Sequence, residues 1–216
     1  MTALLRLDIR EDRPLRVLAL GAHADDIEIG AAGLIDRLVA EHAGLETRWL
    51  VASAEGVRAV EARASFAGLL GDRGSSIELG GFPDGYLPFH GEPVKRWVAG
   101  HAGFQPDIVL APWRGDAHQD HRLLGELAWQ VYRDAMILEY EILKYDGDLG
   151  RPNLYVDLDE AAAERKVRRI LEGVPSQTAR PWFTGETFRS MLRIRGVESA
   201  APGGYAEAFH AAKLRF

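Results

Sequence analysis

The stretch RVLALGAHADDIEIG, residues 16–30, decides the fold. Its first five residues are mostly apolar, as is typical of a buried strand, and a glycine and a polar loop follow at once. A histidine and two adjacent acidic residues, His23, Asp25 and Asp26, lie where that strand ends, with Glu28 close behind. In open α/β sheets, ligand sites lie at the carboxyl ends of the strands. The stretch therefore predicts a strand that delivers polar side chains to a site.

This loop does not match the fingerprint of a dinucleotide-binding fold. That fingerprint has the form G-x-G-x-x-G after the first strand, so that the backbone can approach a pyrophosphate. Here the loop reads Gly21, Ala22, His23, Ala24, and the acidic residues that follow would repel a phosphate. We therefore expect no dinucleotide cofactor.

Outward from this stretch, strand-like and helix-like segments alternate along the chain. The alternation predicts an α/β fold: a doubly wound, mainly parallel sheet with helices on both faces. The tail at 205–216 receives no assignment. Besides the first strand, strands are predicted at 46–53, 75–80, 107–113, 137–145 and 153–158, and helices at 31–44, 57–71, 92–103, 118–135, 160–173 and 185–196.

A second polar stretch, RGDAHQDH, follows the fourth predicted strand. If the early strands take the common order 3-2-1-4-5, strands 1 and 4 are neighbours and the two polar stretches meet in one crevice. His118 and His121 are three residues apart at the start of a helix, so both can face one side. Asp116 is expected to cap that helix, and Asp120 lies between the histidines.

Imidazoles combined with carboxylates are a ligand set that suits zinc, with three protein ligands and an open position for water. The sequence contains no cysteine, so histidine, aspartate or glutamate must hold any metal. Each cluster also has a plainer interpretation, as a hydrogen-bonded structural histidine or a pair of helix-capping aspartates. Two such clusters at loops that share a switch point favour the metal site. The other histidines have no partner pattern and are interpreted as surface or core residues: His42, His90, His101 and His210.

Composition limits the remaining function classes. With 216 residues, 47% of them hydrophobic and 27% charged, the chain is expected to form one globular domain. The net charge is −6 and Lys and Arg are scattered, which is not the footprint of a nucleic-acid-binding protein. No stretch is apolar for long enough to span a membrane, and the N-terminal apolar segment is too short for a secretory signal. We therefore expect a cytoplasmic enzyme; a homo-oligomer is left open.

The two polar stretches resemble a known family. AHADDIEIG (22–30) resembles the AHPDDxExG motif of the PIG-L/LmbE-like zinc-dependent N-acetylglucosaminyl deacetylases, and HQDH (118–121) resembles their HxDH motif. The segment 57–71 resembles the family's arginine- and glutamate-bearing helix, and 204–209 its C-terminal segment. Ala24 stands where the family usually has proline. That proline stiffens the loop without touching metal, so we expect a small cost and no loss of chemistry.

The resemblance implies a Rossmann-like fold and a single deacetylase domain over residues 1–216. It implies a zinc-dependent hydrolase that removes an acyl group, normally acetyl, from a small-molecule amino sugar or related amine; another divalent metal is an alternative to zinc. The metal ligands that it implies are His23, Asp26 and His121. The catalytic roles that it implies are a general base for Asp25, stabilisation or protonation of the tetrahedral intermediate for His118, and orientation of His118 for Asp120.

Candidates for substrate binding are less specific. Each charged candidate has two interpretations: its side chain lines the crevice and binds hydroxyls or an anionic group, or it is a solvated charge. The candidates are Arg58, Glu61, Arg63, Arg114 and Lys144.

Aromatic side chains also have two interpretations, stacking on a sugar ring or core packing; Trp113, Tyr145 and Trp182 are the candidates.

Two other functions remain as alternatives. One is a metal-dependent hydrolase of phosphoesters, esters or other amides, although crowded carboxylates with few nearby cations disfavour a highly charged phosphate. The other is a non-catalytic binding module, which loss of the base or of a ligand would favour; neither is lost here.

Overall fold

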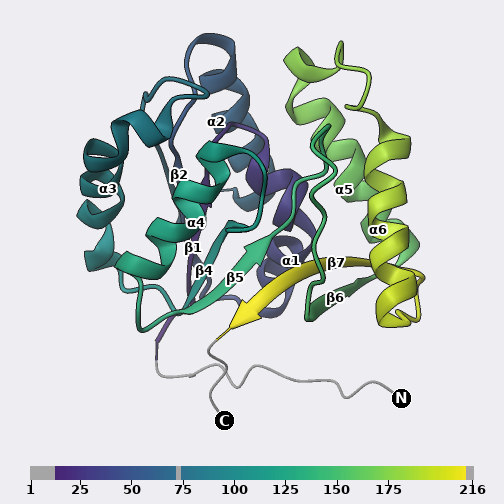
Figure 1. Ribbon diagram of the computed structural model, residues 1–216. Helices are drawn as coiled ribbons and strands as arrows, with labels where there is room; N and C mark the ends of the chain where they lie inside the picture. Colours follow the sequence, from purple (N-terminus) through teal and green to yellow (C-terminus); the bar gives the residue numbers. More distant parts are fainter. Residues whose placement is uncertain (1–12, 72–73, 213–216) are drawn as a thin grey trace.

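A central sheet organises the computed structural model, which describes residues 13–71 and 74–212 (Figure 1). Within these residues the sheet has seven strands in the order β3-β2-β1-β4-β5-β7-β6. Neighbouring strands from β3 to β5 are parallel, whereas β7 runs antiparallel to both β5 and β6. The strands are β1 (Arg16–Gly21), β2 (Glu46–Val51), β3 (Ser76–Leu79), β4 (Ile108–Pro112), β5 (Met136–Tyr140), β6 (Leu154–Leu158) and β7 (Tyr205–Ala212).

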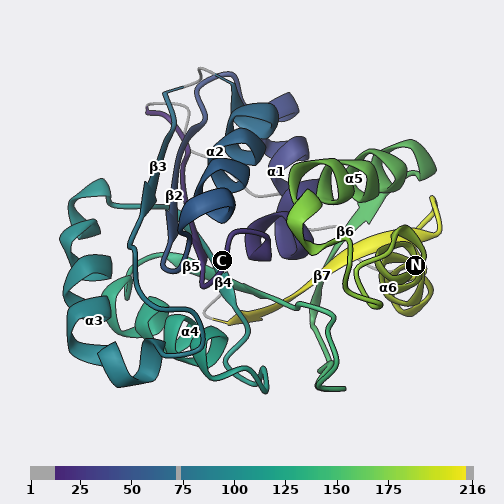
Figure 2. The ribbon, with the colours of Figure 1, turned by 90° about the horizontal axis from the view of Figure 1, so that it is seen from above.

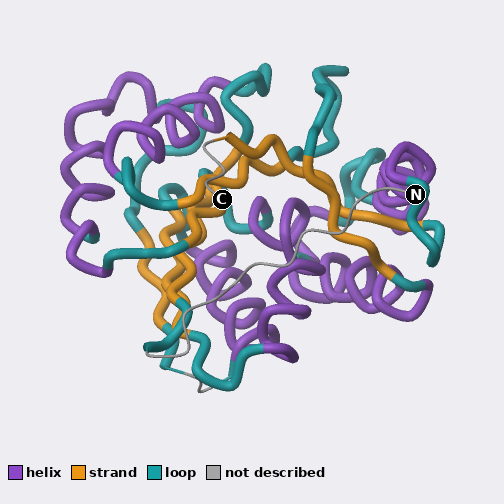
Figure 3. Tube along the Cα trace, turned by 90° about the horizontal axis from the view of Figure 1, so that it is seen from below, coloured by secondary structure: helices purple, strands orange, loops and turns teal. Residues whose placement is uncertain are grey.

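Helices cover both faces of this sheet, as Figures 2 and 3 show. α3 and α4 lie on one face, and α1, α2 and α5 on the other, while α6 packs against β7. No helix within the described ranges is long and apolar enough to cross a membrane. The α-helices are α1 (Asp26–Glu41), α2 (Gly56–Leu70), α3 (Gly91–Gly100), α4 (Gln119–Val131), α5 (Glu160–Gly173) and α6 (Gly185–Ser199), and the short 3-10 helices are η1 (Leu87–His90), η2 (Ala102–Phe104) and η3 (Pro175–Gln177).

The central strands are buried on both faces because successive side chains point to opposite sides of the sheet. In β1, Val17 and Ala19 join the core beneath α1 and α2, and Leu18 and Leu20 join the core beneath α3 and α4. This two-sided burial explains why the strand is apolar at every position after Arg16. The predicted doubly wound, mainly parallel α/β sheet is confirmed, as is the order 3-2-1-4-5 of its first five strands.

β7 is the main element that the sequence did not reveal. It comes from the segment left unassigned, whose alanines give little strand signal, yet it pairs with a strand on each side. Tertiary pairing thus overrides weak local propensity. The end of that segment, 213–216, lies outside the described residues.

Two element boundaries matter for the site. The strand predicted at 137–145 ends at Tyr140, so the residues after it leave the sheet as a loop. Helix α1 starts at Asp26 rather than at residue 31, directly behind β1. Gly30 allows this helix to lie close to the sheet, because a Cβ there would come within 2.1 Å of the Tyr140 ring. The acidic pair of the first motif is therefore held at the sheet's carboxyl edge.

Candidate metal centre and active site

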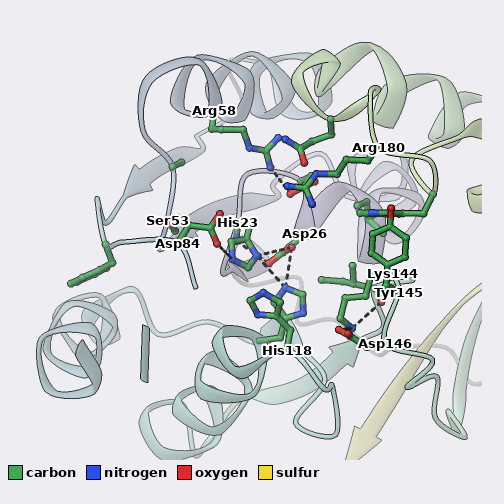
Figure 4. A pocket seen from close by; sticks show the side chains of 18 of the residues that line it. His23, Asp26, Ser53, Arg58, Asp84, His118, Lys144, Tyr145, Asp146 and Arg180 are labelled. Atoms are coloured by element: carbon green, nitrogen blue, oxygen red, sulfur yellow. Dashed lines mark hydrogen bonds and ion pairs between the residues drawn. The ribbon is translucent and has the colours of Figure 1, made fainter. Parts of the chain in front are cut away.

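The two polar stretches meet at the switch point between β1 and β4. His23 lies in the loop after β1, Asp26 is the first residue of α1, and His118 and His121 lie at the start of α4. All four residues line one cavity, and Figure 4 shows His23, Asp26 and His118 pointing toward one another. The structure brings the two motifs together, as predicted.

Three candidate ligand atoms form a nearly equilateral triangle. His23 Nδ1 lies 3.2 Å from His121 Nε2, and Asp26 Oδ1 lies 3.6 Å from His23 Nδ1 and 3.4 Å from His121 Nε2. Tetrahedral zinc with bonds of about 2.0–2.2 Å needs ligand atoms roughly 3.3–3.6 Å apart. All three residues also line the cavity. The side chains therefore fit a divalent ion with a position open to the cavity.

The outward-facing nitrogen of each histidine meets a carboxylate. His121 Nδ1 lies 2.9 Å from Asp116 Oδ2. His23 Nε2 lies 3.0 Å from Asp84 Oδ1 and 3.4 Å from Asp120 Oδ2. Metal-binding histidines normally donate their second N–H to such a group, which fixes the tautomer and the ring. His121 makes this contact at hydrogen-bond geometry, whereas His23 Nε2 is only within ion-pair distance of its carboxylates; in both residues the inward-facing nitrogen remains the candidate ligand atom.

Asp26 is held in place and ionised. Its Oδ2 accepts hydrogen bonds from the backbone N–H of Ala22 (2.8 Å) and of His23 (2.9 Å), which leaves Oδ1 facing the histidines. Burial alone would raise the pKa of Asp26, but His121 and His23 outweigh it and hold the pKa well below its usual range. Burial likewise opposes charge on His121, but Asp26 and Asp116 raise its pKa to about 9. The negative charge of Asp26 and Asp116 beside His121 would also attract a divalent cation, which takes the place of the proton.

Three other clusters compete less well for a metal. One contains His23, Asp84 and Asp120 and lies at the outer nitrogen of His23, away from the Asp26 carboxylate. Nitrogen atoms of His23, His118 and His121 lie within 4.8 Å of one another, but this set omits the oriented Asp26 carboxylate. The third cluster contains Asp116, Asp146 and Asp148. The Lys144 ammonium lies among these three carboxylates, at 2.8, 3.7 and 2.7 Å respectively, so that cluster already holds a cation.

Asp25 lies beside the ligand triangle and is paired differently. Its Oδ1 accepts a hydrogen bond from Arg58 Nη2 at 2.6 Å, and it lines the cavity. Burial raises the pKa of Asp25, and the Arg58 charge opposes this rise. Glu61 in turn pairs with Arg58 at 3.2 Å and accepts hydrogen bonds from Ser176 N and Oγ. The two adjacent aspartates therefore occupy distinct environments.

Asp120 contacts His118 through its backbone and not through its carboxylate. The Asp120 carboxylate accepts hydrogen bonds from the backbone N–H of Gly85 (2.8 Å) and Leu87 (3.1 Å), and so fixes the loop before η1. Asp120 contacts His118 through its backbone N–H, which donates to His118 Nδ1 at 3.3 Å. His118 itself is therefore the N-cap of α4. Asp116, predicted for that position, instead accepts a hydrogen bond from the His118 N–H at 2.7 Å.

Glu28, the remaining acid of the first motif, is buried within the fold away from the cavity lining. Burial raises its pKa to about 8, against the opposing effect of a hydrogen bond from Ser65 on α2. We therefore assign it no part in the site.

The structure separates the predicted substrate-binding residues into two groups. Arg58 and Lys144 line the cavity, whereas Arg63 and Arg114 are absent from its lining. Arg63 lies about 140° around α2 from Arg58, which turns it to solvent. Arg114 instead pairs with Glu139 on β5 at 2.5 Å. For Arg63 and Arg114 the structure therefore favours the second interpretation, a solvated or paired charge outside the crevice.

The cavity has a volume of about 490 Å³, within the range of small-molecule sites of about 300–1,000 Å³. Tyr145, 69% exposed, and Trp182 line it and lie edge to face, so both remain candidates for contact with a sugar ring. Trp113 instead stacks on His210 outside the cavity, at 4.4 Å between ring centroids.

Sequence reasoning missed four charged residues of the lining, which are Glu55, Asp84, Asp146 and Arg180. Asp84 lies in a turn-rich segment between β3 and η1, and Arg180 in the loop between η3 and α6. Neither follows a strand of the predicted switch point, so no local pattern connects them to it.

Comparison with known sequences identifies one family. The sequence profile described as "PIG-L: GlcNAc-PI de-N-acetylase" matches residues 18–132, which is more than half of the chain and includes both polar motifs.

Solved structures share the fold. The conserved protein TT1542 from Thermus thermophilus is 23% identical, with a TM-score of 0.72 over 94% of this chain and 97% of that one. The N,N'-diacetylchitobiose deacetylase from Pyrococcus horikoshii, in complex with its inhibitor MPG, is 24% identical, with a TM-score of 0.70 over 91% and 83%. GalB, the 4-carboxy-2-hydroxymuconate hydratase from Pseudomonas putida KT2440, is 18% identical, with a TM-score of 0.71 over 94% and 98%. Since a deacetylase and a hydratase share this fold, the reaction must be argued from the site.

Proposed function

This chain belongs to the PIG-L family, and we propose that it is a metal-dependent N-deacetylase of an amino sugar or an amino-sugar conjugate. The observation that carries the proposal is the triangle of His23 Nδ1, Asp26 Oδ1 and His121 Nε2, with the Asp25 carboxylate beside it. An amide resists hydrolysis because its carbonyl is a poor electrophile and its leaving amine is a strong base. The site offers groups that can activate the carbonyl and groups that can protonate the leaving amine.

His23, Asp26 and His121 would hold the ion, and their two imidazoles and one carboxylate suit zinc. When bound, zinc polarises a carbonyl group and lowers the pKa of water to about 7. The protein keeps the ligand atoms in position through the outer contacts of the two histidines and the two backbone N–H groups on Asp26. Little rearrangement is then needed on binding.

Asp25 is assigned as the general base. It takes a proton from the attacking water and passes it to the leaving amine, so the same carboxyl group serves both steps. Arg58 Nη2 donates to Oδ1 and thereby fixes the orientation of the carboxylate. We assign Oδ2 as the oxygen that carries the proton.

His118 is assigned to the carbonyl oxygen. Because its Nδ1 accepts the hydrogen bond from the Asp120 N–H, the proton of the neutral ring lies on Nε2. An N–H donor fixed in this way can stabilise the oxygen as it gains negative charge. This role needs no carboxylate on His118, in keeping with the position of Asp120.

The test is release of a primary amine and acetate by purified, zinc-loaded protein. The substrates are a panel of N-acetylated sugars, including N-acetylglucosamine and N,N'-diacetylchitobiose, together with lipid- and thiol-linked conjugates. We expect amine release that chelation of the metal abolishes and added zinc restores. His42→Ala, a change at the far end of α1, is the control that should keep activity.

Two results would contradict the proposal. Zinc-loaded protein that releases no amine from any member of the panel would exclude an amino-sugar deacetylase. Hydrolysis of phosphoesters in the same assays would instead favour the alternative metal-dependent hydrolase.

A further inference from the structure

Arg180 extends over the cavity from the loop between η3 and α6. Figure 4 shows its guanidinium group directed into the cavity, toward the side on which His23 and Asp26 lie. This residue is far in sequence from both motifs of the metal site. It is nevertheless part of the same cavity lining.

The other two lining cations already have carboxylate partners. Arg58 Nη2 lies 2.6 Å from Asp25 Oδ1, and Lys144 Nζ lies 2.8 Å from Asp116 Oδ1. Among the residues that the structure describes, none forms a hydrogen bond or an ion pair with the guanidinium of Arg180. Arg180 is thus the lining cation whose donors are available to a ligand.

The backbone around Arg180 is fixed. The Arg180 N–H donates to the carbonyl oxygen of Gln177 at 2.9 Å, and the Phe183 N–H donates to that of Arg180 at 3.0 Å. The Phe183 side chain is 2% exposed and anchors the following turn in the core. On the other side, the buried Glu61 carboxylate accepts hydrogen bonds from Ser176 N at 2.8 Å and Oγ at 2.7 Å. Such anchoring reduces the ordering cost of binding a ligand.

The acidic lining residues limit how much negative charge the cavity can take. Asp25 lies against Arg58, and Asp146 lies 3.7 Å from Lys144 Nζ, so both are already compensated. Asp84 instead faces the imidazole of His23. Glu55, just before α2, also lines the cavity, and its carboxylate has no cationic partner within the described chain. A ligand with many negative charges would be repelled there. A ligand with one anionic group beside Arg180 matches this distribution of charges along the cavity lining.

We propose that the substrate carries a single carboxylate or phosphate group, apart from the scissile amide, which Arg180 binds. The planar guanidinium donates two parallel hydrogen bonds to either group, a geometry that a lysine ammonium cannot provide. The inference rests on the proposed deacetylase function and narrows its substrate to an anionic amino sugar. Arg180 then acts as a specificity-determining residue and takes no part in bond cleavage.

The first experiment compares deacetylation of N-acetylglucosamine, N-acetylglucosamine 6-phosphate and N-acetylmuramic acid. The expected result is a higher kcat/KM for at least one anionic substrate; the phosphate and the carboxylate arms show which group is preferred. Arg180→Gln should lower that value about tenfold, mainly through KM, and leave the neutral substrate unchanged. Arg180→Lys should restore part of the loss. Arg63→Gln, an exposed arginine outside the cavity, is the matched control.

The second experiment measures binding, which does not depend on turnover. Calorimetric titration of the zinc-loaded protein with glucosamine, glucosamine 6-phosphate and muramic acid should show tighter binding of an anionic sugar. Arg180→Gln should remove that advantage. Equal affinity for all three sugars, or an advantage that survives Arg180→Gln, would overturn the inference. If the anionic preference is found but no amine is ever released, the proposed function fails and the anion site stands.

Discussion

The two walls of the cavity are built in different ways. The wall at the ends of β1 and β4 consists of buried side chains from two short motifs, held by backbone N–H groups and by each other. The opposite wall comes from loops, and its side chains Tyr145 and Arg180 are exposed. The buried wall gives fixed geometry for chemistry, whereas the loop wall gives contacts that differ easily between relatives. We therefore expect changes in the first wall to affect turnover and metal binding, and changes in the second to affect substrate choice.

The largest effect is expected at Asp25. Asp25→Asn keeps the shape of the side chain and removes its basicity, so turnover should fall on the order of 10²- to 10⁴-fold. Zinc content and thermal stability should stay near those of the wild type, because Asp25 lies outside the ligand triangle. An Asp25→Asn protein that lacks zinc and regains activity when zinc is added would show that Asp25 is a ligand.

The next largest effect is expected behind His121, one of the three proposed ligands. Asp116→Asn weakens the contact on His121 Nδ1, and loss of such an outer partner typically lowers metal affinity about 10- to 100-fold. Competition with a chromogenic chelator measures this affinity directly. An unchanged zinc affinity would mean that the Asp116 contact does not position the ligand.

A smaller effect on the same quantity is expected at Lys144. Lys144→Met removes the cation that holds Asp116 Oδ1 and Asp148 Oδ2, so zinc affinity should fall by less than in Asp116→Asn. Lys95→Met is the control, since Lys95 contacts Gln130 on the surface away from the cavity. If zinc affinity stays unchanged while KM rises, Lys144 binds substrate as the sequence first suggested.

The smallest effect is expected at Ala24. No hydrogen bond within the described chain uses its backbone N–H, so the proline that the family usually has there would remove none. Ala24→Pro should change the free energy of unfolding by at most about 1 kcal/mol and leave zinc content unchanged. Thermal denaturation compared with metal analysis tests this, and loss of zinc would show that the loop cannot accept the proline.

The same contrast between the two walls explains how much could be predicted. The alternation of strands and helices predicted a mainly parallel α/β sheet. With the common strand order 3-2-1-4-5 assumed for it, the switch-point rule brought His23 and His121 together. That reasoning used only patterns within each segment of the sequence. The position of β7 depends on pairing with two distant strands, and its alanines carry little local signal.

Side-chain direction was the second limit. Arg114 lies beside the second motif and faces Glu139, whereas Arg180 lies far from both motifs and reaches the cavity. Asp120 likewise contacts His118 through its backbone N–H, while its carboxylate turns to Gly85 and Leu87. Tertiary packing decides the direction of these side chains, and no spacing rule along the chain encodes that packing.

The most direct test of the account is a crystal structure of the zinc-loaded protein, with anomalous diffraction to locate the ion. We expect one zinc ion bonded to His23 Nδ1, Asp26 Oδ1 and His121 Nε2 at about 2.0–2.2 Å. Asp25 should lie within hydrogen-bond reach of water in the open position, at roughly 2.6–3.2 Å, without binding the ion. Zinc bound through Asp25 or His118, or no ion in this triangle after zinc addition, would contradict the account.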